Sequence, residues 1–250
     1  DKKGELLTIT KETDPNLDMA SMHLDEFSKA GKAILFANVK GSKFRAASNL
    51  FGSLERSKLM FSDTLNKVKK LIDLKTNPSS ALKNPFQAIF TVLHAIYAIP
   101  VKVRFPSKFK EIKIEDIPQV KCWKEDGGAF ITLPQVYSED VENPGIMNSN
   151  LGMYRIQLSG NDYVPNKEVG MHYQIHRGIG VHQHKANKKG EPLKVSIFVG
   201  GPPAHTFAAV MPLPEGMSEI AFAGILGGRN FRYAKKDDYI ISADADFVIC

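Results

Sequence analysis

The sequence contains only two cysteines, Cys122 and Cys250, in 250 residues. They lie far apart and lack the short spacing of a cysteine metal motif. Such sparse cysteine usage favours a reducing compartment over an oxidising one. No signal peptide is visible, so the expected location is the cytoplasm.

The chain also lacks an apolar run long enough to cross a bilayer. Its longest apolar stretch, residues 86–101, is interrupted by Gln87, His94 and Pro100. A membrane-spanning helix needs about 20 consecutive apolar residues. The stretch therefore predicts a packed helix, and the protein is not expected to be transmembrane.

A concentrated basic surface is missing as well, although the net charge is +6. The lysines are scattered, with only short pairs such as Lys69-Lys70 and Lys188-Lys189. No predicted helix carries a basic stripe interleaved with aromatic residues, which is the usual sign of nucleic-acid binding. Nucleic acid is therefore not an expected partner. Internal repeats and low-complexity tracts are also lacking.

Strand and helix patterns alternate through the first part of the chain. Strands are predicted at 6–13 and 33–39, and helices at 18–31 and 62–74. This alternation is typical of an α/β layer. It predicts an N-terminal α/β domain over residues 1–106.

Strands dominate after residue 106, with two short helices predicted at 203–211 and 218–226. A strand-rich segment of this length suits a β-barrel or a strongly bent sheet. The predicted fold class is therefore α+β, with a second domain over residues 107–250.

Candidate functional side chains gather between residues 148 and 178, where two predicted strands flank a polar loop. This segment contains Asn150, Arg155, His172, His176 and Arg177. Arginine binds phosphate or carboxylate through a planar fork of donors, and imidazole and amide groups can ligate a divalent cation. The hairpin could hold an anionic ligand beside a metal. The alternatives are histidines paired with neighbouring backbone groups and a weak surface ion pair at Arg155.

A second stretch, residues 200–219, adds a carboxylate. A predicted strand runs into two glycines and two prolines, then a short helix and a rigid turn, and Glu219 opens the next helix. One interpretation is a first-turn carboxylate that the helix dipole favours. The other is the anionic metal ligand that Asn150 and His172 lack.

These stretches resemble the UbiD-like decarboxylases, which include ferulic acid decarboxylase and the 3-octaprenyl-4-hydroxybenzoate decarboxylases. An early Asn-Leu-Phe-Gly signature lies within residues 47–56. The remaining motifs follow in the family's order: Asn150-Leu-Gly-Met-Tyr-Arg155, His172-Tyr-Gln-Ile-His-Arg-Gly178, Gly201-Pro-Pro-Ala204 and Met211-Pro-Leu-Pro-Glu-Gly-Met-Ser-Glu219.

The resemblance implies non-oxidative decarboxylation of an aromatic or α,β-unsaturated carboxylic acid with prenylated FMN, in quinone biosynthesis among other settings. It implies that residues 107–250 form a flavin-binding split β-barrel. The implied partners are a small aromatic acid as substrate, a flavin prenyltransferase that supplies the cofactor, and further copies of the chain in a homo-oligomer.

The resemblance also assigns roles to individual residues. Asn150, His172 and Glu219 would ligate Mn²⁺, with K⁺ as a further candidate cation, and Arg155 would be catalytic beside the substrate carboxylate. The implied cofactor-binding set is Asn150, Met153, Tyr154, Arg155, His172, Tyr173, Gln174, Arg177, Gly178 and Met211.

One family feature is missing. The catalytic carboxylates of the family lie in a Glu-Gly-Pro-(Phe/Tyr)-Gly-(Glu/Asp) motif, which the sequence does not contain. Together with the Asp1 start and the strand-like end, this leads us to expect part of a longer protein, without the family's C-terminal domain and inactive alone. The alternatives are an FMN-dependent split-barrel oxidoreductase and a cofactor-binding module without turnover.

Overall fold

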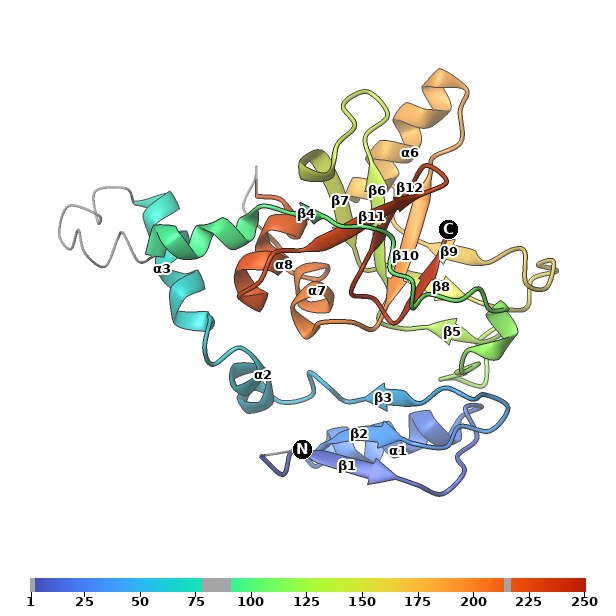
Figure 1. Ribbon diagram of the computed structural model, residues 1–250. Coiled ribbons are helices and arrows are strands. Elements are labelled where there is room, and N and C mark those ends of the chain that lie inside the picture. Colours follow the sequence, from blue (N-terminus) through green and yellow to red (C-terminus); the bar gives the residue numbers. More distant parts are fainter. Residues whose placement is uncertain (1–2, 78–90, 214–216) are drawn as a thin grey trace. The chain divides into compact units, whose positions relative to one another are not determined.

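The computed structural model describes residues 3–77, 91–213 and 217–250 (Figure 1). The chain forms two compact units, each assembled from separate stretches, and each unit is described by itself. The first unit comprises Asp1–Met60, Phe109–Thr132 and Arg155–His172, and the second comprises Phe61–Lys108, Leu133–Tyr154 and Tyr173–Cys250.

The first unit begins with a three-stranded sheet in the order β1-β2-β3. The strands are β1 (Leu6–Ile9), β2 (Ala33–Phe36) and β3 (Ala46–Ser48). β1 and β2 run parallel, whereas β2 and β3 are antiparallel. The connection between the parallel strands contains helix α1 (Asp18–Ser28), and α2 (Leu54–Met60) follows the sheet (Figure 1). The predicted strands and helix in this region are confirmed, with shorter bounds.

Packing of α1 on the sheet forms a small apolar core. Met19 of α1 clusters with Ile34, Phe36 and Val39, and Phe36 is fully buried. Burial of such side chains is the main favourable contribution to folding. The N-terminal part of the first unit therefore has a core of its own.

A second sheet in the first unit has the order β5-β8-β9. It contains β5 (Phe130–Ile131), β8 (Arg155–Gln157) and β9 (Gly170–His172), after the short 3₁₀ helix Ile114–Asp116. β8 and β9 are antiparallel and place Arg155 directly opposite His172. This pairing confirms the predicted hairpin and makes two candidate residues cross-strand neighbours.

The second unit contains two further sheets. The four-stranded one has the order β13-β10-β6-β7, and the three-stranded one has the order β12-β11-β4. Their strands are β4 (Val101–Lys102), β6 (Gln135–Glu139), β7 (Ser149–Gly152), β10 (Val195–Val199), β11 (Arg232–Lys236), β12 (Tyr239–Ser242) and β13 (Phe247–Ile249). The strand pairings among the described residues close no barrel, so the split barrel remains a prediction. The mixture of strands and helices is confirmed.

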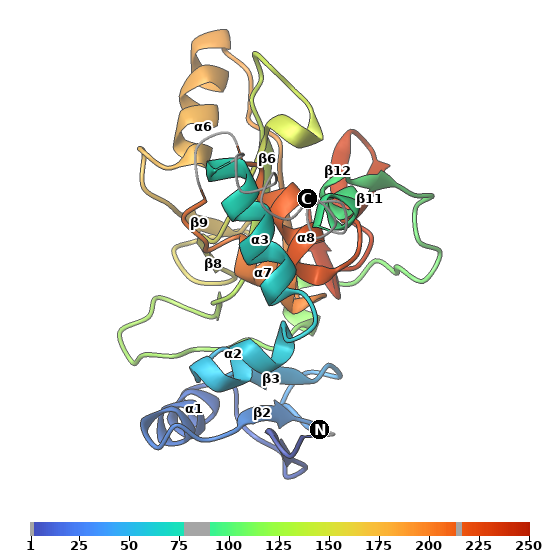
Figure 2. The ribbon, with the colours of Figure 1, turned by 90° about the vertical axis from the view of Figure 1, so that its left-hand side faces the viewer.

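Helices cover these sheets. They are α3 (Leu65–Thr76), α6 (Gly178–Lys189), α7 (Pro203–Ala208) and α8 (Glu219–Gly227), with 3₁₀ helices at Ala95–Ala98 and Ile146–Asn148. α8 packs against α7, α3 and β7, and Figure 2 shows α3 beside α7 and α8. α8 is apolar all round and largely buried, so it forms part of the core of the second unit.

Two local predictions are wrong. Residues 150–158 were expected to form one strand, but the strand is interrupted at Met153–Tyr154 into β7 and β8, which join different sheets. The segment 182–184 was expected at a polar hairpin tip, yet it lies in helix α6. His182 is buried there, with Nδ1 3.0 Å from Ser138 Oγ.

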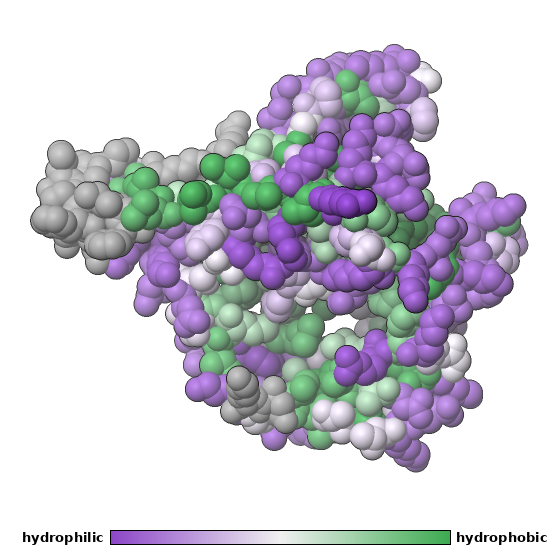
Figure 3. All heavy atoms as spheres, viewed as in Figure 1, coloured by the Kyte–Doolittle hydropathy of each residue, from purple (hydrophilic) through white to green (hydrophobic). Residues whose placement is uncertain are grey.

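The apolar stretch 86–101 is only partly a packed helix, and residues 86–90 lie outside the described residues. From 91 the chain is helical and then enters β4, with His94 buried and its Nε2 2.9 Å from the carbonyl oxygen of Ile225. Val92, Leu93 and Ile96 are exposed, and they form part of an apolar band at the surface (Figure 3). Within the described residues, no helix is both long and apolar enough to span a membrane.

Candidate functional site

Arg155, the predicted catalytic residue, is held by two groups of the first unit. Its Nη2 donates a hydrogen bond to Asp126 Oδ2 at 2.6 Å, and its guanidinium carbon lies 3.7 Å from the centre of the Phe130 ring. Asp126 is nearly buried, with 8% of its side chain exposed, whereas Arg155 is 36% exposed. The hydrogen bond from Arg155 is the main cause that lowers the pKa of Asp126. Arg155 is therefore oriented on one side and open to solvent on the other.

His172 lies opposite Arg155 and contacts the same aromatic ring. Its ring is 5.6 Å from that of Phe130, in an edge-on arrangement, and its Nε2 lies 3.2 Å from Gln157 Oε1. The amide group of Gln157 donates to the carbonyl oxygen of Ser159, so Oε1 is the atom that faces His172. His172 Nε2 is then the donor, and Nδ1 keeps the lone pair that a metal needs.

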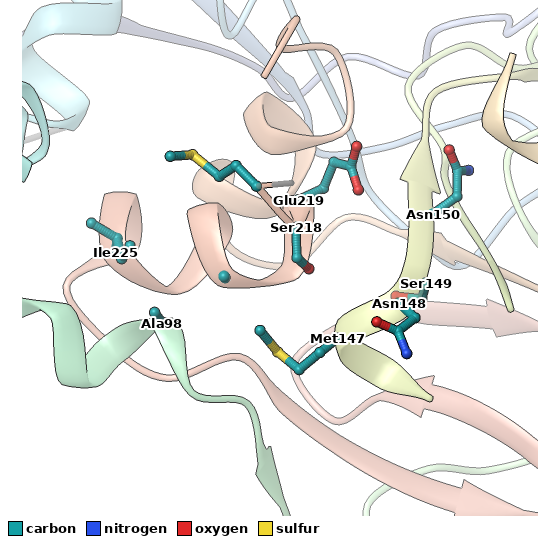
Figure 4. A pocket seen from close by; sticks show the side chains of 10 residues that line it. Ala98, Met147, Asn148, Ser149, Asn150, Ser218, Glu219 and Ile225 are labelled. Atoms are coloured by element: carbon teal, nitrogen blue, oxygen red, sulfur yellow. The ribbon is translucent and has the colours of Figure 1, made fainter. Parts of the chain in front are cut away.

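Asn150 and Glu219 line one cavity in the second unit, with a volume of about 580 Å³. Asn150 comes from β7, and Glu219 opens α8. Figure 4 shows these two elements facing one another across the cavity. The remaining lining residues are Ala98, Met147, Asn148, Ser149, Met217, Ser218, Ala221 and Ile225.

The cavity contains a carboxylate without a cationic partner among the described residues. Burial raises the pKa of Glu219, and the peptide groups of Glu219 itself and of Leu151 only partly oppose this shift. Beside it, Ser218 Oγ is buried and has no hydrogen-bond partner in the described part of the chain. Unpaired buried oxygens are costly, and a bound cation would satisfy them. The oxygen donors of Glu219 and Asn150 suit a hard cation such as Mn²⁺.

The side chain of Asn150 is fixed by close neighbours. Its Nδ2 donates to the hydroxyl of Tyr154 at 3.3 Å. On its other side lies Gly178, where a Cβ atom would come within 2.1 Å of Asn150 Oδ1. Any larger residue at position 178 would displace the amide oxygen. Gly152 similarly gives room to Tyr154, whose ring meets that of Tyr173 edge-on at 6.3 Å.

The predicted site residues are divided between the two units. Arg155 and His172 belong to the first unit, and the structure brings them together on β8 and β9. The second unit contains the others, namely Asn150, Met153, Tyr154, Tyr173, Gln174, Arg177, Gly178, Met211 and Glu219. The convergence of His172 with Asn150 and Glu219 on one metal remains a prediction. Within the described ranges, no three His, Cys, Asp or Glu side chains form a metal cluster.

Sequence reasoning missed Asp126, Phe130, Gln157 and Ser218. Asp126 lies 29 residues before its partner Arg155, in a turn that precedes Gly127 and Gly128. No periodicity marks such a residue. The only available signal was an acidic residue beside a glycine pair, just before a short apolar strand.

Comparison with family models gives two matches. Residues 1–75 match the model of the 3-octaprenyl-4-hydroxybenzoate carboxy-lyase N-terminal domain. Residues 98–250, more than half of the chain, match the model of the Rift-related domain of the same carboxy-lyase, UbiD.

Individual proteins are similar over the whole chain. A 4-hydroxybenzoate decarboxylase polypeptide from Chlamydia pneumoniae is 35% identical over 256 residues, which cover 98% of this chain and 42% of that protein. The vanillic acid decarboxylase of Sedimentibacter hydroxybenzoicus in its closed form superposes with a TM-score of 0.77 at 24% identity, over 99% of this chain and 51% of that one.

A second solved structure, the UbiD-class enzyme HmfF from Pelotomaculum thermopropionicum in complex with FMN, gives a TM-score of 0.75 at 21% identity. It too is matched over 99% of this chain and 51% of that one. The chain thus spans about half the length of the relatives that it matches.

Proposed function

Because the chain belongs to the UbiD family of carboxy-lyases, we propose that it serves the non-oxidative decarboxylation of an aromatic or α,β-unsaturated carboxylic acid, with prenylated FMN and Mn²⁺. The observation that carries the proposal is the oriented Arg155, paired across β8 and β9 with His172. Two relatives are named for the decarboxylation of hydroxybenzoate-type acids, which supports an aromatic substrate.

In this proposal Arg155 binds the substrate carboxylate. Its Nε and Nη1 have no hydrogen-bond partner among the described residues, and a planar guanidinium matches a carboxylate in geometry and charge. Phe130 fixes the plane of the guanidinium, so the carboxylate is positioned before carbon dioxide leaves. The bound flavin would supply the electron sink that no side chain provides.

Asn150, His172 and Glu219 would hold the manganese that anchors the flavin phosphate. One amide oxygen, one imidazole nitrogen and one carboxylate form a donor set that suits Mn²⁺. Gln157 would set the tautomer of His172, and Gly178 would keep the amide oxygen of Asn150 in place. K⁺ is a further candidate, and the carboxylate of Glu219 with the unpaired Ser218 hydroxyl offers oxygen donors for it.

The proposal extends to partners and setting. A flavin prenyltransferase would supply the cofactor, and copies of the chain would assemble into a homo-oligomer in the cytoplasm. The strands of residues 107–250 would form the family's split barrel around the flavin. The name of the matched family supports a role in quinone biosynthesis.

The test is to purify the intact gene product after co-expression with a flavin prenyltransferase, and to record absorbance, cofactor mass and metal content. We expect a prenylated flavin and about one equivalent of manganese. Glu219→Gln should lose the metal, whereas Glu55→Gln, at an exposed first-turn glutamate of α2, should keep it. Unmodified FMN without metal, with a nicotinamide requirement, would instead support the oxidoreductase alternative. A bound cofactor without turnover would support the binding-module alternative.

A further inference from the structure

We infer that Asp126 is a positioning residue for Arg155, which holds the guanidinium against Phe130 and leaves its other N–H groups for the substrate carboxylate. This inference rests on the proposed function, which assigns the carboxylate to Arg155. It adds a residue outside the motifs that carry the family resemblance.

Asp126 is itself rigidly held. The backbone N–H of Trp123 donates to Asp126 Oδ2 at 3.1 Å, and the N–H of Asp126 donates to the carbonyl oxygen of Trp123 at 3.1 Å. The turn is therefore closed from both sides, and the carboxylate is 8% exposed. A carboxylate fixed in this way directs the flexible arginine side chain into one orientation.

The ring of Phe130 supplies the second constraint. Phe130 is 5% exposed and lies beneath the guanidinium, with the edge-on ring of His172 nearby. A cation over an aromatic face is stabilised by the ring quadrupole. With Asp126 at one edge of the guanidinium and Phe130 beneath it, the opposite edge is where a ligand carboxylate can bind.

The pair has two opposing effects on a carboxylate ligand. Asp126 neutralises part of the charge of Arg155 and so weakens binding of the ligand in its ground state. It also fixes the geometry in which the carboxylate is held for reaction. Removal of the Asp126 charge should therefore tighten ligand binding and slow turnover, whereas a purely structural defect would weaken binding and slow turnover together.

The first experiment measures the reactivity of Arg155 with an arylglyoxal in the intact gene product, followed by peptide mass spectrometry. In Asp126→Asn, Trp123 keeps its acceptor while the ion pair is lost. We expect Arg155 to react roughly fivefold faster, the factor that a partly exposed ion pair of about 1 kcal/mol produces. Asp126→Glu, which keeps the charge, should react slowly. Equal rates in wild type and Asp126→Asn would overturn the inference.

A matched control is available elsewhere in the chain. Asp244 is 5% exposed and pairs with Arg229 at 2.7 Å and with Arg232. Asp244→Asn should accelerate modification of these two arginines and leave Arg155 unchanged. Acceleration of Arg155 in this variant would show a global opening and would contradict a specific role for Asp126.

The second experiment measures benzoate binding and turnover in the flavin-loaded protein. We expect Asp126→Asn to bind benzoate about threefold more tightly and to lower kcat by about tenfold or more, since small misplacements of a catalytic group are costly. Weaker binding together with slower turnover would contradict the inference. If wild type decarboxylates no aromatic acid, the proposed function fails, and the arylglyoxal result still decides whether Asp126 positions Arg155.

Discussion

Replacement of Glu219 by glutamine should separate its effect on the metal-free protein from its effect on metal binding. Burial raises the pKa of Glu219, and no cationic side chain among the described residues offsets that burial. A carboxyl whose folded-state pKa is raised contributes stability at low pH, and this contribution is lost as the pH rises through the folded pKa. At neutral pH the ionised Glu219 therefore destabilises the metal-free protein, and Glu219→Gln should melt at the same temperature or higher.

Manganese should reverse this order. At a concentration 100 times its Kd, a ligand stabilises the folded state by about 2.7 kcal/mol. In a chain of this length, each kcal/mol raises Tm by about 2–4 °C, so the wild type should gain roughly 5–11 °C. Glu219→Gln lacks the anionic ligand and should gain little.

Differential scanning fluorimetry with Mn²⁺, with EDTA and with neither additive measures both effects on one plate. Glu55→Gln is the matched control, because Glu55 also lies in the first turn of a helix but has 82% of its side chain exposed. It should shift with manganese as the wild type does. A manganese shift in Glu219→Gln equal to that of the wild type would refute the assignment of Glu219 as a ligand.

Other predictions concern the chemistry, the core and the pH dependence. Arg155→Ala should abolish decarboxylation by the intact gene product while its manganese content, measured by mass spectrometry, stays unchanged; loss of metal would contradict this division of roles. Phe36→Ala removes a fully buried ring and should lower the free energy of unfolding by about 3–5 kcal/mol in urea titrations. Burial lowers the pKa of His205 from 6.5 to about 4, so its contribution to stability is present above pH 6.5 and is lost as the pH falls toward 4. Between pH 7 and pH 4 this loss is on the order of 3 kcal/mol, and urea titrations of His205→Phe should lack it.

The N-terminal layer could be predicted because its local signals agree with its packing. The apolar residues of 18–31 recur at helical spacing, and α1 forms there and packs Met19 into the core. The pairing of Arg155 with His172 could also be predicted, because the polar loop between two strand-like segments leaves a hairpin as the simple solution.

The break between β7 and β8 could not be predicted from residue preferences. Every residue from Asn150 to Leu158 is acceptable in a strand, and the interruption arises from tertiary packing. The ring of Tyr154 occupies the space beside Gly152, where a Cβ atom would lie 2.4 Å from the Tyr154 hydroxyl. Only the packed structure shows that the chain moves from one sheet to another at this point.

Helix α6 was missed although its end was marked. Lys188 and Lys189 lie in its last turn, and Gly190 ends it in the left-handed conformation with φ 72°. These are standard C-terminal signals. The glycines at 178 and 180 and the weak amphipathic pattern concealed the helix, since its buried face includes His182 and Gly180 rather than large apolar residues. Asp126 was missed for a different reason, because it contacts Arg155 across 29 residues of intervening chain.

The most direct test of the central claim is carbon dioxide release from a panel of aromatic and α,β-unsaturated acids by the intact gene product, reconstituted in parallel with prenylated FMN and with FMN. Membership of the UbiD family and the oriented Arg155 predict release only with prenylated FMN and manganese, without nicotinamide. Turnover that needs FMN and a nicotinamide, or loss of the flavin with no loss of decarboxylation, would contradict it.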